Sequence, residues 1–276
     1  MDNKLTVPDR PLTWLITGCS SGFGVALTRI AQKNGHNVVA TSRNPSKHTE
    51  SQREIENRRL RRAARPLTFW STTPAGRSMA PAESFTEEEV RAQMETIFFG
   101  PYRLMRAMTT FMRERRTWII VNISSGAGLE GRESMGIYAA AKAGMDGNKV
   151  LAKEIAPFGV RVLTVALGAF DTNVGSGVKF ASRPTPREYD GSEMEKLTKL
   201  VAAAATVGFP ADGDHLKAAQ VIYEVVTGTG VGERKEAERV LPLGRDLAKR
   251  VSGVVEGWQR TMGIFGDVCN NVLIDK

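Results

Sequence analysis

A glycine-rich segment at residues 17–24, Thr-Gly-Cys-Ser-Ser-Gly-Phe-Gly, constrains the fold of this chain more than any other feature. It follows the apolar run Trp14-Leu15-Ile16, which predicts a strand, and it precedes a helical pattern over about residues 23–33. Glycines at this spacing let the chain turn tightly and bring backbone N–H groups against a pyrophosphate, and the helix N-terminus adds the positive end of its dipole. The segment therefore predicts the first βα unit of a dinucleotide-binding domain.

Beyond this unit, runs rich in valine and isoleucine alternate with amphipathic helical patterns. Strands are expected at residues 38–40, 118–123, 160–166 and 240–243, and helices at 52–64, 86–113, 137–156, 214–226 and 245–262, with a bend at Gly100-Pro101. This alternation is typical of βαβ units. We expect an α/β fold, a Rossmann-type doubly wound parallel sheet flanked by helices, in a single domain over residues 1–276.

Residues 175–210 are expected to form an irregular, partly helical insertion. Its apolar side chains suit a lid over an apolar ligand, and they suit equally the packing of a small satellite helix. These side chains are Val178, Phe180, Tyr189, Met194, Leu197 and Leu200.

The end of the second predicted strand indicates which dinucleotide binds. NAD-binding domains place a carboxylate there to bond the adenosine ribose 2′-OH, whereas this chain has Thr41-Ser42-Arg43. The guanidinium of Arg43 is predicted to pair with a 2′-phosphate, and Ser42 to donate to the same group. These residues favour NADP(H) over NAD; the alternative is an ordinary exposed loop arginine.

Candidate catalytic residues follow in the frame Asn122-Ile123-Ser124-Ser125-Gly126 and, thirteen residues after Ser125, Tyr138-Ala139-Ala140-Ala141-Lys142. Tyr138 and Lys142 are four residues apart on one predicted helix and so share a face, where the ammonium favours tyrosinate and lowers the phenol pKa. Tyr138 is then able to protonate a nascent alkoxide or to deprotonate an alcohol. Ser125, at the carboxyl end of a strand, is predicted to hydrogen-bond the substrate oxygen.

The glycine spacing, the serine and the Tyr-x-x-x-Lys pair, in this order, resemble the motifs of the short-chain dehydrogenase/reductase family from Leu12 to Lys142. Gly213-Asp214 and Leu241-Pro242-Leu243-Gly244 extend the likeness. The resemblance implies that Lys142 also bonds the nicotinamide ribose, that Thr172 contacts the carboxamide, and that the protein forms homodimers or homotetramers through the helix of Tyr138. The predicted cofactor-binding residues are Gly18, Ser20, Ser21, Gly22, Phe23, Gly24, Ser42, Arg43, Tyr138, Lys142 and Thr172.

Three positions depart from the family's pattern. The Asn-Asn-Ala-Gly that follows the fourth strand has a counterpart only in Ala75-Gly76. The asparagine that organises a proton relay to the lysine is replaced by Ile97, which cannot hydrogen-bond a water. The Pro-Gly after the sixth strand is Leu167-Gly168. These departures bear on activity more than on fold.

The segment between Arg43 and Phe85 is also short. A βαβ unit takes roughly 30 residues, so after a helix at 52–64 there is no room for a third strand and its helix. One set of codons for the residues from Leu67 to Pro74, read in another frame, spells Asp-Leu-Leu-Val-Asn-Asn-Ala. We hypothesise that a deletion, a misplaced splice junction or a gene-model error removed one βα unit and shifted the frame; a genuine loop variant is the alternative.

Composition limits the remaining functions. The net charge of +8 comes partly from the basic run at residues 58–65, yet no aromatic residue or nucleic-acid motif accompanies it, so we expect no nucleic-acid partner. Two cysteines, Cys19 and Cys269, and three scattered histidines suggest neither a disulfide framework nor a metal site. Without a secretion signal or a membrane-length apolar run, a cytoplasmic protein is expected.

The sequence thus predicts an NADP(H)-dependent oxidoreductase that interconverts a carbonyl and an alcohol on a fairly apolar small molecule of lipid, steroid or secondary-metabolite type. The departures keep a second function open: a redox-silent relative with weak or no cofactor binding, acting as a binding or assembly protein.

Overall fold

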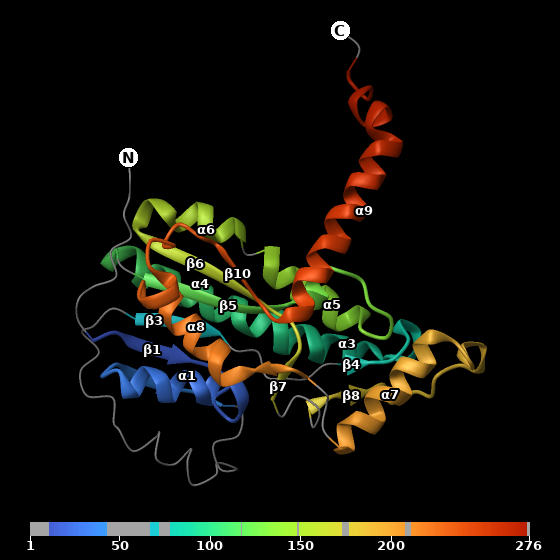
Figure 1. Ribbon diagram of the computed structural model, residues 1–276, viewed down its shortest axis with the longest axis horizontal. Coiled ribbons are helices and arrows are strands. Elements are labelled where there is room, and N and C mark those ends of the chain that lie inside the picture. The colour runs from blue at the N-terminus through green and yellow to red at the C-terminus, as the bar shows by residue number, and fades with distance from the viewer. Residues whose placement is uncertain are drawn as a thin grey trace.

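The computed structural model describes residues 11–42, 67–71, 78–116, 118–147, 149–172, 177–207 and 211–274. These residues form a six-stranded parallel sheet in the order β10-β6-β5-β3-β1-β2, flanked by helices (Figure 1). The strands are β1 (Thr13–Ile16), β2 (Asn37–Ala40), β3 (Leu67–Ser71), β5 (Trp118–Ser125), β6 (Val160–Leu167) and β10 (Val240–Leu243). The helices are α1 (Gly22–Lys33), α3 (Glu87–Met94), α4 (Gly100–Arg115), α5 (Gly136–Gly147), α6 (Lys149–Ile155), α7 (Glu193–Val207), α8 (His215–Thr227) and α9 (Arg245–Asn270).

The core lies in two layers, one on each face of the sheet. On β5, Val121 and Ile123 point toward α1 and α8, while Ile120, directly before them, points toward α4, α5 and α6. This period of two follows from the pleat of a strand, and a strand buried on both faces reads as a continuous apolar run. The doubly wound parallel sheet expected from the sequence is therefore confirmed.

The strand β3 occupies the position between β1 and β5. Leu67–Ser71 pairs in parallel with β1 over four register positions and with β5 over three. This segment is the one whose codons spell the family motif in another frame, and as translated it still forms the strand. Within the described residues the sheet ends at β2, and the predicted loss of one βα unit concerns residues 43–66, outside the described residues. The helix predicted at 52–64 and the basic run at 58–65 lie outside the described residues.

The long helix predicted at 86–113 begins and bends near the expected places. Thr86 caps α3 by accepting from the Glu89 N–H at 3.3 Å, and the Glu89 carboxylate accepts from the Thr86 N–H at 2.9 Å. A π-helical turn, Glu95–Phe99, then joins α3 to α4. Pro101 has no N–H to donate to the carbonyl of Ile97, and the N–H of Gly100 reaches Glu95 instead, so the turn widens.

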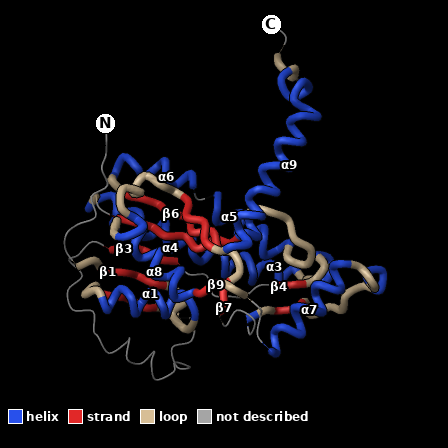
Figure 2. The backbone as a smooth tube through the Cα atoms, viewed as in Figure 1, coloured by secondary structure: helices blue, strands red, loops and turns tan. Residues whose placement is uncertain are grey.

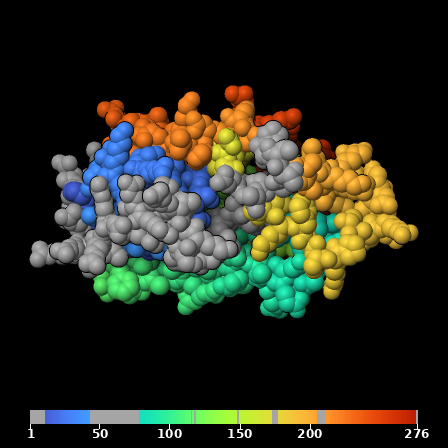
Figure 3. All heavy atoms as spheres, turned by 90° about the horizontal axis from the view of Figure 1, so that it is seen from below, coloured from blue at the N-terminus to red at the C-terminus, as the bar shows by residue number. Residues whose placement is uncertain are grey.

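Two shorter pairs of parallel strands complete the described residues. β4 (Ser78–Met79) pairs with β8 (Lys179–Phe180), and β7 (Phe170–Asp171) pairs with β9 (Gly213–Asp214). The first pair attaches residues 177–207, including α7, to the rest of the molecule, and in the space-filling view these residues form a lobe at one end (Figure 3).

The last helix is longer than predicted. The sequence pattern predicted an end at Met262, but α9 continues through Gly263 and Gly266 to Asn270. Beyond its first turns it projects away from the sheet (Figure 2). A search of the described helices finds none with both the length and the apolar character needed to cross a membrane.

Candidate active site

The glycine-rich loop is held in a conformation that requires its glycines. Gly18 and Gly22 have φ of 70° and 55°, in the left-handed region that side chains avoid. A Cβ on Gly24 would lie 2.4 Å from the carbonyl oxygen of Gly18, so only glycine fits there. The buried Cys19 between them ties the loop to the end of β2, because its N–H donates to the carbonyl of Thr41 at 3.0 Å.

The N-terminus of α1 has no side-chain cap from its N-cap residue, Ser21, and no acidic residue stands in the first turn. The ring of Phe23 packs edge-on against Phe170 at 5.3 Å between centroids, so its side chain faces the protein and only its backbone is directed to the loop. Uncapped N–H groups and a positive dipole end without a carboxylate suit a bound phosphate. Ser20 lies exposed on the same loop.

Thr172 lies beside the loop and carries an unsatisfied hydroxyl. A Cβ on Gly22 would meet the Thr172 side chain at 3.5 Å. The Oγ1 atom of Thr172 is buried and has no hydrogen-bond partner among the described residues. A buried hydroxyl without a partner is costly, and a polar group of a ligand in this place would satisfy it. The loop glycines and this hydroxyl therefore fit a dinucleotide.

The residues predicted to select NADP are only partly described. Ser42 lies two residues after the end of β2, half-buried, on the side of the sheet where the strand's carboxyl end lies. Arg43 lies outside the described residues. The preference for the 2′-phosphate thus stays a prediction from the sequence.

Ser125 ends the central strand β5, and a 3₁₀ turn, Gly126–Gly128, follows it. The Ser125 hydroxyl accepts a hydrogen bond from the Ala127 N–H at 3.2 Å, which fixes the direction of the side chain at the strand end. This bond uses a lone pair of the hydroxyl oxygen, so the hydroxyl hydrogen can still donate to a ligand.

Tyr138 and Lys142 lie one turn apart on α5, as the spacing predicts. The Nζ atom of Lys142 is 5.8 Å from the centre of the Tyr138 ring and donates to the backbone carbonyl of Ile123 at 2.8 Å. Lys142 is buried, and this burial lowers its pKa from 10.5 to about 8, while the neighbouring Asp146 carboxylate raises it. At neutral pH the ammonium persists close to the phenol.

Asp146 is a functional candidate that the sequence reasoning missed. It follows Lys142 by one further turn of α5 and is buried, and burial raises the pKa of its carboxyl while Ser124, Lys149 and Lys142 lower it. The signal was present in the sequence, since an acid four residues after a lysine shares its helix face. Asp146 is a candidate positioning residue, because its carboxylate raises the pKa of the neighbouring Lys142.

The place of the family's relay asparagine is apolar in this chain. Ile97 is fully buried within the π-helical turn and belongs to the same cluster as Ala141 and Met145 of α5. It therefore lines the side of α5 that carries Lys142 with hydrocarbon, and it offers no group that could order a water.

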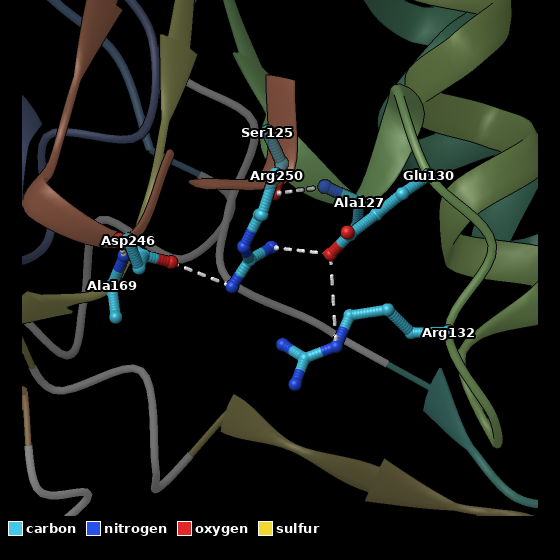
Figure 4. A network of polar contacts seen from close by, with 7 residues as sticks. All are labelled: Ser125, Ala127, Glu130, Arg132, Ala169, Asp246 and Arg250. Atoms are coloured by element: carbon cyan, nitrogen blue, oxygen red, sulfur yellow. Dashed lines mark hydrogen bonds and ion pairs between the residues drawn. The ribbon is translucent and has the colours of Figure 1, made fainter. Parts of the chain in front are cut away.

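A second group of charged residues, also missed, ties the first turns of α9 to the loops of the site (Figure 4). Arg250 pairs with Asp246 at 2.7 Å and with Glu130, in the loop after Ser125, at 3.4 Å. Asp246 in turn accepts from the N–H of Ala169, after β6, at 3.0 Å. The loops that follow β5 and β6 are thus both bonded to the first turns of α9.

Apolar side chains of the insertion lie next to Tyr138. Val178 and Leu197 pack with Met79, Met135 and Val201 in a cluster that also contacts the Tyr138 ring. Phe180 and Leu200, by contrast, are exposed. Part of the insertion therefore contributes to a hydrocarbon wall beside the phenol.

Comparison with known proteins agrees with this geometry. The family model described as short chain dehydrogenase matches residues 72–180, a span that contains Ser125, Tyr138 and Lys142. Oxidoreductase claN of Passalora fulva is 35% identical over 184 residues, which cover 59% of this chain and 84% of that protein. A 3-ketodihydrosphingosine reductase of Bacteroides thetaiotaomicron is 36% identical over 176 residues, covering 59% and 65% respectively.

Solved structures of short-chain dehydrogenases are also similar to this chain. A short-chain dehydrogenase of Streptomyces avermitilis superposes with a TM-score of 0.80 at 27% identity, over 96% of this chain and 100% of that one. A short chain dehydrogenase of Burkholderia cenocepacia in complex with NADP has a TM-score of 0.63 at 19% identity, over 92% and 97%, and shares the fold. The fold and site define a Rossmann-type oxidoreductase. The chain belongs to the short-chain dehydrogenase/reductase family, whose members bind nicotinamide cofactors.

Proposed function

We propose that this protein is an NADP(H)-dependent reductase or dehydrogenase that interconverts a carbonyl and an alcohol on a fairly apolar small molecule. The observation that carries the proposal is the position of Tyr138, with the buried ammonium of Lys142 5.8 Å from its ring centre and an apolar cluster around it. A phenol held beside a positive charge, next to a hydrocarbon surface, suits proton exchange with an oxygen of an apolar substrate.

Each residue of the site would have one role in substrate binding or proton transfer. Ser125 donates to the substrate oxygen and holds it, and Tyr138 gives that oxygen a proton in reduction or removes one in oxidation. Lys142, anchored on the Ile123 carbonyl, stabilises the tyrosinate left behind. The glycine loop, the N-terminus of α1 and Thr172 would bind the cofactor, which supplies or accepts the hydride when bound.

The substrate class is supported by two features. Val178 and Leu197 place hydrocarbon beside the Tyr138 ring. The relative from Bacteroides is named a 3-ketodihydrosphingosine reductase, and another from Streptomyces virginiae a putative ketoacyl reductase of a polyketide synthase, and both names describe ketone reduction. A lipid, steroid or secondary-metabolite ketone is the class we propose, with residues 175–210 as its lid. A cytoplasmic location, and homodimers or homotetramers, are predicted with it.

The redox-silent alternative is favoured by one observation: Ile97 fills with hydrocarbon the place of the group that would order the proton relay to Lys142. In that case the protein would keep the fold and act as a binding or assembly protein.

A titration of the purified protein with NADPH and NADH, followed by nucleotide fluorescence, tests the proposal. We expect NADPH to bind at micromolar concentrations and more tightly than NADH, and Thr172→Val to weaken NADPH binding because the buried hydroxyl loses its ligand partner. Thr109→Val, which changes a threonine bonded to its own helix, is the matched control and should bind normally. Absence of binding at millimolar NADPH contradicts the enzyme; binding without turnover of any apolar ketone favours the redox-silent protein.

A further inference from the structure

The last helix carries an apolar repeat that the site does not use. Leu247 and Arg250 attach the first turns of α9 to the loop after Ser125, and the rest of the helix extends away from the sheet (Figure 1). Along this free part, apolar residues recur at alternating intervals of four and three residues and continue just past the helix end. They are Val251, Val255, Trp258, Met262, Phe265, Cys269 and Val272, and we name them the apolar stripe.

The apolar stripe is exposed although its side chains are large. Trp258 is 67% exposed and Phe265 is 56% exposed, and the remaining members are exposed as well. A mean spacing of 3.5 residues over three heptads is the pattern of a left-handed coiled coil, in which such a stripe faces a partner helix. Val254, Ile264 and Val268 are further apolar residues of the free part that lie outside this repeat.

The free part of α9 is also a poor helix by itself. It contains Gly253, Gly257, Gly263 and Gly266, each with open space around the position of a Cβ. Glycine in a helix interior is unfavourable, and helices in proteins owe most of their stability to packing of their apolar face. A partner along the apolar stripe would supply that packing.

The charge of the free part indicates which partner. Its charged residues are Glu256, Arg260 and Asp267, so the polar face is nearly neutral and slightly acidic. A helix that lies on an anionic lipid surface or on nucleic acid is rich in lysine and arginine, and this one is not. A second copy of this helix, with the same nearly neutral polar face, would meet little electrostatic repulsion from the first.

The area is sufficient for a specific dimer. With seven exposed side chains at on the order of 100 Å² each, two copies would bury on the order of 1,400 Å², within the range of roughly 1,200–2,000 Å² typical of specific interfaces. We infer that α9 pairs with α9 of a second copy of this chain through the apolar stripe, in a two-stranded coiled coil. This inference does not depend on the proposed redox function.

The mass of the full-length protein in solution, measured by light scattering, tests the pairing. Trp258→Glu with Phe265→Glu places two charges in the apolar stripe, and we expect the mass of the assembly to fall by half. The control, Gly253→Glu with Gly263→Glu, adds the same charge off the stripe and should keep the wild-type mass. Far-UV circular dichroism of the stripe variant should lose part of its helical signal, because the free part of α9 then lacks its packing partner, and it should keep the signal of the folded sheet domain.

A neutral pair, Trp258→Gln with Phe265→Gln, repeats the test if the charged variant aggregates. An unchanged mass in both stripe variants overturns the inference, even if the wild type is a dimer, because that dimer would then use another surface. In that case, the proteins are also sedimented with phosphatidylserine vesicles. If the wild type sediments with the vesicles and the stripe variants do not, the stripe binds a lipid surface instead of a second copy.

Discussion

The parallel sheet differs between its catalytic side and its cofactor side. On the catalytic side, β5 and β6 are eight residues long and pair over all eight register positions, and both are buried on two faces. On the cofactor side, β1 and β2 have four residues each, and β2 is only partly buried at the edge of the described sheet. The candidate catalytic serine thus ends one of the most extensively paired strands, and the proposed adenosine side of the cofactor site lies at the least extensively paired ones.

The predicted loss of one βα unit concerns residues 43–66, which lie outside the described residues. Among the described strands, β1 is joined to β3 on one side and to β2, at the edge, on the other. The register of β5, which places Ser125, does not depend on that edge. The comparison predicts that cofactor binding and chemistry can be damaged separately.

The largest effect is expected for Tyr138→Phe. Removing the phenol proton donor should lower kcat by about 10²–10⁴-fold with an apolar ketone and NADPH, while the dissociation constant of NADPH changes little. Steady-state turnover and a fluorescence titration measure the two quantities. Tyr102→Phe, on the exposed face of α4, is the control. If Tyr138→Phe weakened NADPH binding as much as it lowered kcat, the catalytic side and the cofactor side would not be separable.

The converse change is Gly24→Ala. Its Cβ would lie 2.4 Å from the Gly18 carbonyl oxygen, a backbone atom that cannot move without opening the loop. We expect a loss of about 1–3 kcal/mol in unfolding free energy and at least a tenfold weaker affinity for NADPH. Gly147→Ala, at the open end of α5, should be neutral or stabilising. Undiminished NADPH binding in Gly24→Ala would show that the loop does not hold the cofactor.

Most of the helices and strands were predicted from local sequence patterns. The glycine loop, the capping box of Thr86 and the Tyr138–Lys142 spacing are each encoded within a few residues, because tight turns and helix faces depend on near neighbours. The structure confirms the elements that they predict, with ends shifted by one or two residues except in α9. The Rossmann-type sheet followed from the alternation of such elements.

Contacts between distant residues could not be read in the same way. Nothing in the sequence near Ser125 indicates that Arg250, 125 residues later, pairs with Glu130. The strand β3 was equally hidden, since Leu67–Ser71 forms a strand by pairing with β1 and β5 on both sides. Burial of Ile97 and Asp146 around Lys142 depends on how the π-helical turn packs against α5, which periodicity does not define.

A smaller effect, on the catalytic side, is expected for Asp146→Asn. Lys142 with a pKa of about 8 is an ammonium below that pH, so turnover should decline as the pH rises past about 8. The Asp146 carboxylate raises the pKa of Lys142; its removal should shift the alkaline limb of kcat/KM to lower pH by about half a unit to one unit. Glu154→Gln, exposed on α6, should leave the limb in place. An unmoved limb in Asp146→Asn would contradict the positioning role.

The smallest effect is expected on the cofactor side, at His36, which joins the turn before β2 to α8. Its Nδ1 accepts from the Leu12 N–H at 2.8 Å and its Nε2 lies 2.9 Å from the Tyr223 hydroxyl, while burial lowers the pKa of His36 below 6.5. The folded state therefore prefers the neutral ring. The stabilisation is complete above about pH 6.5 and is lost as the pH falls from there toward the lower pKa of the folded state.

Urea unfolding at pH 7.5 and 5.5 measures this loss, which should reach about 0.5–1 kcal/mol, the contribution of one hydrogen bond. His36→Gln should remove that part of the pH dependence, whereas His215→Gln, a histidine that packs on Phe23 instead, should retain it. If His36→Gln retains the full pH dependence of the unfolding free energy, the hydrogen bonds of His36 do not stabilise the segment before β2. The strand pairings of β2 with β1 would then be its main support, and titration of His36 should not alter NADPH affinity between the two pH values.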